Sequence, residues 1–161
     1  MAERIYLDWN ASAQLRAEAR AAAIAALDVC GNPSSAHSEG RAARAVVEKA
    51  RAQVAAAIGA AHGDIVFTAG ATEAAALALS GRDLSSADIE HDAVMAWTRG
   101  DLAVDQDGRV EIKDPASSCV QLVNAETGIV QLLPAGLAVT DATQGFGKVP
   151  VAFDALGVDM A

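Results

Sequence analysis

The segment Phe67–Glu73 reads Phe-Thr-Ala-Gly-Ala-Thr-Glu, and its residue types suit the binding of a phosphate group. A β-rich run, Asp64–Thr68, leads into Gly70, and a helix-forming run, Glu73–Leu79, follows. A strand that turns through glycine into a helix gathers backbone N–H groups, a hydroxyl and the positive end of the helix dipole. The segment therefore predicts an anion cradle, although many α/β proteins use such a turn for packing alone.

Two further polar residues stand directly after predicted buried strands. The apolar run Cys119–Val123 stops at Asn124, and Ala138–Thr140 stops at Asp141. In open α/β sheets, ligands bind at the carboxyl ends of the strands, so both side chains are candidates for a ligand site. Taken singly, each residue type is also typical of an ordinary turn or cap.

The spacing of apolar residues and the positions of glycine and proline predict the helices and strands that could position these residues. An alanine-rich helix is predicted over 14–29, ended by Gly31 as its C-cap, and a second helix carries apolar residues at helical spacing from Val46 to Ile58. Ser34 or Ser35 is the expected cap of the second helix, and Gly59 its end. The remaining predictions are an extended segment or strand at 5–7, a strand at 87–90, a short helix at 91–97, and a hairpin turn at Asp107-Gly108 between 102–104 and 109–112.

Composition limits the class of protein. The 161 residues are 52% hydrophobic and 20% charged, which is typical of a globular domain, and the net charge of -9 argues against nucleic acid or an anionic membrane as a partner. No apolar run approaches the length of a membrane span and no signal-peptide pattern follows Met1, so the cytoplasm is expected. The two cysteines, Cys30 and Cys119, are expected to be small buried residues, and with the three histidines they predict no metal site.

The order of several motifs is more specific than any one of them. This sequence resembles the cysteine desulfurase branch of the class V, pyridoxal-phosphate-dependent aminotransferases, from about Tyr6 to Asp159. The resemblance implies an α/β fold like the large domain of the type I PLP-dependent transferases, with a mainly parallel sheet flanked by helices. It implies an N-terminal arm at 1–12 and an incomplete cofactor-binding domain at 13–161. The motifs that carry it are Tyr6–Ala11, Asn32–His37, Gly70–Glu73, Glu90–His91, Asn124–Gly128 and Asp141–Gln144.

The resemblance also implies roles for individual residues. Ala71 and Thr72 are implied to hold the phosphate, His91 to stack on the pyridine ring, and Asp141 to face the pyridine nitrogen. A carboxylate in that place keeps the nitrogen protonated and strengthens the electron sink on which such chemistry depends. A lone histidine at a strand–helix junction is, by default, structural or merely exposed.

Two amides complete the implied cofactor set. Gln144 is implied to bond the phenolic oxygen of the ring, and Asn124 to lie near the same edge or near the substrate carboxylate. By default Asn124 is a turn former and Gln144 a solvated residue. We expect the phosphate residues, His91, Asp141 and Gln144 to converge on one cleft.

The activity implied by the resemblance is cysteine desulfuration. The complete enzyme would convert L-cysteine, or a related amino acid, to L-alanine and pass a persulfide to a sulfur-acceptor protein, as in iron–sulfur cluster assembly, and it would be a homodimer. One alternative keeps pyridoxal phosphate and changes the reaction, as in selenocysteine lyase or another class V lyase or aminotransferase. The other is a catalytically inactive binding protein with the same fold.

The sequence departs from the family in ways that bear on catalysis. In the family a Ser-x-His-Lys segment, whose lysine forms the Schiff base, follows shortly after the position of Asp159, whereas the sequence given ends at Ala161. No lysine stands at the matching position, and neither Cys30 nor Cys119 matches the persulfide-carrying cysteine. We therefore assign no catalytic residue and expect a truncated chain. The lysines are Lys49, Lys113 and Lys148.

Two internal departures affect the sheet and the substrate. Only residues 132–140 separate Gln131 from Asp141, where the family has a crossover helix, and parallel strands need a connection of about a dozen residues. The strand that ends at Asp141 is therefore either placed differently or joined by an unusually tight connection. Ala125 stands where the family has a second asparagine, which weakens the assignment of the substrate class.

Overall fold

The computed structural model describes residues 4–161, and these form two compact units, one ending at Val54 and the other spanning Ala55–Ala161. The first three residues of the predicted arm lie outside the described residues. No strand is assigned at 5–7, where the chain is extended. The division into an arm at 1–12 and a domain at 13–161 stays a prediction.

The first unit contains the helix α1, Ala17–Leu27, and most of α2, Ser38–Ala57. Helix α1 is shorter at both ends than the predicted 14–29, and its C-cap is Asp28 rather than Gly31. The glycine has a different use, because a Cβ on Gly31 would lie 2.3 Å from the carbonyl oxygen of Glu39. Its lack of a side chain lets the loop approach the start of α2 closely.

Helix α2 begins later than predicted because the preceding serines belong to a turn. The Asn32 side-chain oxygen accepts from the Ser34 N–H at 2.9 Å, and the Asn32 carbonyl accepts from the Ser35 N–H at 2.9 Å. The prediction that Ser34 or Ser35 caps α2 is therefore wrong. The cap is His37, whose Nδ1 accepts from the Gly40 N–H at 3.3 Å. Gly59 ends the helix in a left-handed conformation, φ +64°, as predicted.

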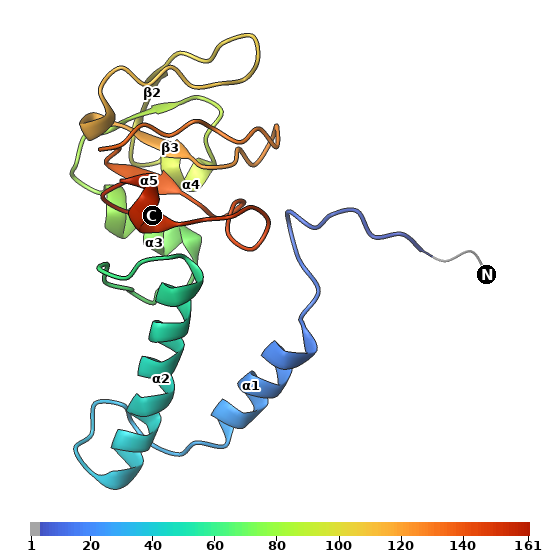
Figure 1. Cartoon of the computed structure of the whole chain (residues 1–161), viewed down its shortest axis with the longest axis vertical. Helices are drawn as coiled ribbons and strands as arrows, with labels where there is room; N and C mark the ends of the chain where they lie inside the picture. The colour runs from blue at the N-terminus through green and yellow to red at the C-terminus, as the bar shows by residue number, and fades with distance from the viewer. Residues whose placement is uncertain (1–3) are drawn as a thin grey trace. The chain divides into compact units, whose positions relative to one another are not determined.

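The second unit is built on two pairs of short parallel strands, of which β2 and β3 are labelled in Figure 1. Strand β1, Ser85–Ala87, pairs in parallel with β2, Arg99–Leu102, and β3, Cys119–Gln121, pairs in parallel with β4, Val139–Asp141. A parallel bridge between Ser85 and Ser118 joins the two pairs. The strand order is therefore β2-β1-β3-β4, and the predicted α/β architecture with a mainly parallel sheet is confirmed.

The sequence left two alternatives for the strand that ends at Asp141: a different place in the sheet, or an unusually tight connection. The pairing of β3 with β4 decides between them. The strands are parallel neighbours, with Gln121 opposite Asp141, so β4 is not placed elsewhere. The connection, residues 122–138, contains no helix. It folds back on itself through an antiparallel bridge between Val123 and Val130. The tight, helix-free connection is the alternative that holds.

Three local predictions differ from the structure in instructive ways. No strand is assigned at Asp64–Thr68, because within the described part of the chain this segment joins no ladder, and Val66 is 71% exposed. Strand β1 ends at Ala87 instead of continuing to Glu90, since the Glu90 N–H turns back to the Ala87 carbonyl at 3.2 Å. The reversal at Gly108 is confirmed, but it forms only one antiparallel bridge, between Val104 and Val110.

Short helices and apolar side chains complete the second unit. They are α3, Ala71–Leu79, α4, Asp92–Met95, the 3₁₀ helix η1, Pro115–Ser117, and α5, Phe153–Leu156. Figure 1 shows α3, α4 and α5 grouped around the strands. Successive residues of a strand face opposite sides, so Cys119 and Val120 belong to two different core clusters. The first contains Leu79, Leu84, Val94, Cys119, Ala138 and Val139, and the second Val120, Leu137 and Val158.

In the described part of the chain, no helix has the length and apolar character needed to cross a membrane. The two cysteines differ from each other. Cys119 is buried, as predicted, whereas Cys30 is exposed, so the prediction of a buried Cys30 is wrong. Cys30 follows the end of α1, a helix that buries none of its residues, so no core lies beside it.

Candidate functional site

Buried polar side chains gather where β1 and β3 end. Glu90 follows β1 and is 4% exposed, Gln121 ends β3 and is 2% exposed, and Asn124 follows β3 and is 2% exposed. Buried polar groups are costly unless they are paired, and each of these is paired. The carboxyl edge of the sheet is therefore a connected polar layer.

Glu90 is the charged member of this layer. Its two carboxyl oxygens accept from the Gln121 backbone N–H at 3.2 and 3.0 Å. Burial raises the pKa of the Glu90 carboxyl to about 7; the negative charge of Asp141 acts in the same direction and the Gln121 hydrogen bond in the opposite one. Glu90 thus holds a proton through most of the acidic range. It was not assigned a site role from the sequence, although an acid directly after a buried strand was a usable signal.

The side chain of Asn124 is fully engaged within the protein. Its amide nitrogen donates to the Ile89 carbonyl at 2.7 Å and to the Gln121 side-chain oxygen at 3.0 Å. Its oxygen accepts from the backbone of Glu126 and from both the backbone and the hydroxyl of Thr127. This arrangement is that of a turn former, the default interpretation, and the role of Asn124 toward a ligand stays a prediction.

Asp141 ends β4 and is half-buried. One of its carboxylate oxygens accepts from the Thr143 N–H at 2.9 Å, and its carbonyl accepts from the Leu122 N–H at 2.9 Å. The side chain is therefore oriented by the turn that follows the strand. In that turn the Gln144 side-chain oxygen is contacted by the ammonium of Lys148, which is itself exposed.

His91 is exposed and caps α4. Its Nδ1 accepts from the Ala93 N–H at 3.1 Å. In the neutral ring the proton is therefore assigned to Nε2. This hydrogen bond is the structural role that the default interpretation predicts, and it also anchors the imidazole directly after Glu90. Stacking on a pyridine ring stays a prediction.

The predicted anion cradle stands at the start of α3. Ala71 and Thr72 occupy the first turn, where N–H groups lack an intrahelical acceptor. A Cβ placed on Gly70 would meet no atom within 4 Å, so the approach to this helix end is open. The Glu73 carboxylate accepts from the Ala69 N–H at 2.6 Å, so this side chain stabilises the turn that leads into α3.

The structure brings some of the predicted residues together and leaves others unconnected. Of the predicted residues, Asn124 and Asp141 share the polar layer with Glu90 and Gln121, neither of which was predicted as a site residue. Helix α3 ends at Leu79, which packs on Cys119 and Val139, and the chain then enters β1 after a short connection. Helix α3 must therefore run back against the strands, which directs its N-terminus toward the same edge. Convergence of all the predicted residues on one cleft stays a prediction.

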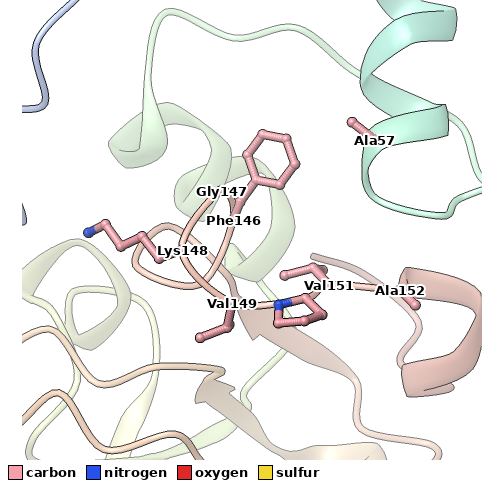
Figure 2. A pocket seen from close by; sticks show the side chains of 8 residues that line it. Ala57, Phe146, Gly147, Lys148, Val149, Val151 and Ala152 are labelled. Carbon is pink, nitrogen blue, oxygen red and sulfur yellow. The ribbon is translucent and has the colours of Figure 1, made fainter.

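A separate hollow of about 520 Å³ lies beside the segment that follows Gln144 (Figure 2). It is lined by Ala57 and by residues 146–152. In Figure 2 the Phe146 ring is directed toward the side on which Ala57 lies, and Lys148 extends to the other side. Its lining contains no carboxylate and is mostly apolar, so it does not have the groups expected around a charged pyridine and a phosphate.

Comparison with known proteins agrees with this geometry. Residues 5–161 match the family described as aminotransferase class-V. The chain is 40% identical over 185 residues to the putative cysteine desulfurase IscS 1 of Bacillus subtilis (strain 168), covering 92% of this chain and 49% of that protein. It is 36% identical over 196 residues to a cysteine desulfurase of Cereibacter sphaeroides, covering 98% and 50%.

The same likeness holds in three dimensions. The crystal structure of a NifS-like protein from Rickettsia africae ESF-5 superposes with a TM-score of 0.84 at 28% identity, over 99% of this chain and 54% of that one. A second NifS-like protein gives a TM-score of 0.79 at 26% identity. The chain therefore spans about half the length of the relatives that it matches.

Proposed function

Because the chain belongs to the aminotransferase class-V family, we propose that it is the N-terminal, cofactor-cradling part of a cysteine desulfurase that depends on pyridoxal phosphate. The observation that carries the proposal is the carboxyl edge of the parallel sheet. There the Asp141 side chain is held by the turn after β4, and its negative charge acts on the buried Glu90. We expect the first turn of α3, Ala71–Leu79, to face the same edge.

The residues present fit the chemistry of this cofactor. A phosphate suits the first turn of α3 and the Thr72 hydroxyl, and a pyridine nitrogen suits the Asp141 carboxylate. When bound, the cofactor supplies an electron sink for bond cleavage in an amino acid substrate. The protein's part is to bind, to orient and to place charge.

Each residue has a definite task in this proposal. Asp141 holds a proton at the pyridine nitrogen. His91, fixed through Nδ1, offers a flat face to the ring, and Gln144 offers its amide to the phenolic oxygen. Asn124 would join this set only by exchanging one of its internal hydrogen bonds.

The activity of the whole protein is proposed from its relatives. It would take sulfur from L-cysteine, release L-alanine and pass a persulfide to an acceptor protein, as a cytoplasmic homodimer. The support is that relatives over nearly the whole of this chain carry the name cysteine desulfurase, and some the name IscS. L-cysteine and L-selenocysteine offered side by side to the whole protein would separate desulfurase from lyase specificity, by measuring sulfide and selenide release.

Calorimetric titration of the chain with pyridoxamine phosphate tests the cradle. This ligand needs no covalent link, so binding reports the phosphate and pyridine contacts alone. Charge-assisted hydrogen bonds contribute about 1.5–3 kcal/mol, so Thr72→Ala and Asp141→Asn should each weaken binding by roughly ten- to a hundredfold. Asp107→Asn, an equal charge change at the exposed hairpin turn, should leave it unchanged. Equal affinity in all four proteins would show that the cradle is misassigned, and no binding by the folded chain would refute the proposal.

A further inference from the structure

Glu90 stands where the chain leaves the sheet, one residue before His91. After β1 the backbone turns away, so it cannot supply an acceptor for the Gln121 N–H on the neighbouring strand. The Glu90 side chain takes that place, with its oxygens 3.0 and 3.2 Å from the Gln121 nitrogen. A buried N–H requires an acceptor, which accounts for a polar side chain here but not for a charged one.

Glu90 is linked to Asp141 through a single residue of the β-ladder, Gln121. Gln121, whose N–H Glu90 accepts, is the register partner of Asp141 in the β3–β4 pair. The three residues thus form a row across the carboxyl ends of β1, β3 and β4, which we call the edge row (Glu90, Gln121 and Asp141). The negative charge of Asp141, at one end of this row, raises the pKa of Glu90 at the other end.

The other groups that the structure describes around Glu90 form no ion pair with it. Arg82, whose positive charge acts on the neighbouring Cys119 thiol, donates to the Ala78 carbonyl. Cys119, on β3, is neutral because burial raises the pKa of its thiol to about 12. The neighbouring His91 turns its Nδ1 to the start of α4. Within residues 4–161, no Lys, Arg or His forms an ion pair with Glu90. A cation brought to Asp141 would therefore be a new positive charge near the edge row.

We infer that Glu90 is a positioning residue that acts through Asp141, such that a cation bound against Asp141 releases the proton of Glu90 to solvent. The inference rests on the proposed function, because the cation is the protonated pyridine nitrogen of the cofactor. No bond other than the O–H bond of Glu90 breaks, and the negative charge gained by Glu90 offsets the bound cation. Glu90 is thus more fully protonated when no cation is bound at Asp141 and carries more negative charge when one is bound.

The pH dependence of this release is specific. The free Glu90 carboxyl titrates at about pH 7, and a nearby cation lowers its pKa. Proton release on binding is therefore greatest near pH 7. It vanishes well below that pH, where Glu90 is protonated in both states, and well above it, where Glu90 is ionised in both.

The test is calorimetry with pyridoxamine phosphate in two buffers of different ionisation enthalpy, across a pH series, which counts the protons released. Glu90→Gln is the variant, because its amide oxygen can still accept from Gln121 while it carries no titrating proton. Glu111→Gln removes the same charge at an exposed position and is the matched control. We expect wild type and Glu111→Gln to release a fraction of a proton more than Glu90→Gln near pH 7, with the difference vanishing at both ends of the series.

The outcomes separate this inference from the proposed function. Binding with the same proton count in wild type and Glu90→Gln would overturn the role of Glu90 and leave the cofactor site standing. No binding by the folded wild type would overturn both. Should Glu90→Gln fail to fold, carboxyl carbon NMR of the wild type decides the matter: the Glu90 midpoint should fall by about one pH unit on adding the ligand, and an unchanged midpoint would refute the inference.

Discussion

Helices α1 and α3 are both rich in alanine, yet the two compact units treat them differently. Helix α1 buries none of its residues, and Leu27 at its end is 85% exposed. Helix α3, in the second unit, ends in Leu79, which is 1% exposed and packs against strands β3 and β4. Alanine favours the helical backbone in both cases, but most helix stability in proteins comes from burial of one face. The comparison separates local propensity from tertiary packing within one chain.

Thiol chemistry should reveal the largest difference between the two units. Cys30 is exposed, whereas Cys119 is buried and its thiol pKa is raised to about 12. Because the thiolate is the reactive form, Cys30 should react with a disulfide reagent orders of magnitude faster than Cys119. An absorbance assay with a chromogenic disulfide reagent should therefore detect one reactive thiol in the native chain and two in the denatured chain. Cys30→Ser should abolish the native reaction, and a fast reaction that survives in this variant would contradict the burial of Cys119.

Two matched leucine truncations should sharpen the comparison of the helices. Leu79→Ala removes a buried side chain and leaves a cavity, so the free energy of unfolding should fall by about 2–5 kcal/mol. Leu27→Ala removes an exposed side chain, and its effect should stay within about 0.5 kcal/mol. Urea denaturation followed by circular dichroism measures both. Equal losses in the two variants would show that α1 is buried in solution by a contact that this structure does not contain.

The polar edge of the second unit should make stability depend on pH. The folded pKa of Glu90 is about 7 against an unfolded value near 4.5, so the folded chain binds more protons between these values. Below the unfolded pKa, Glu90 does not affect the free energy of unfolding. That free energy then falls by roughly 3 kcal/mol as the pH rises from the unfolded pKa through the folded pKa of about 7. In Glu90→Gln this part of the decline should be absent, as denaturant midpoints across the pH series would show.

Glu111→Gln, which removes one negative charge at an exposed position, is the control in the same experiment. Glu111→Gln should keep the decline of the wild type, because Glu111 is exposed. A decline of the same size in Glu90→Gln would mean that other groups cause it, and that Glu90 is ionised in the folded protein at acidic pH.

Much of the fold was predictable because it rests on local signals. Gly59 ends α2 where a left-handed conformation is needed, and the apolar run at Cys119 becomes β3. The failures occur where the outcome depends on distant partners. Asp64–Thr68 has the composition of a strand but joins no ladder in the described residues, and β1 stops early because the chain turns at Ala87.

The candidate site shows the same limit. The motif order pointed to Asp141 and Asn124, and both lie at the carboxyl edge of the sheet. The sequence did not predict that Asn124 would use its whole amide inside the protein, nor that Glu90 would be buried against Gln121. Hydrogen-bond saturation and desolvation depend on neighbours 30 or more residues away, as the Glu90–Gln121 separation of 31 shows.

The amino-acid sequence by itself determined the helices at α1, α2 and α3, the buried run of β3, and a set of motifs whose order identifies the family. Helix propensity, glycine conformation and hydrophobic runs act over a few residues, so they can be read along the chain. Only the tertiary structure decided which strands pair, which cysteine is buried and which acid keeps its proton. Those properties follow from the removal of water and from charges on neighbouring strands, which bring together residues that the sequence keeps apart.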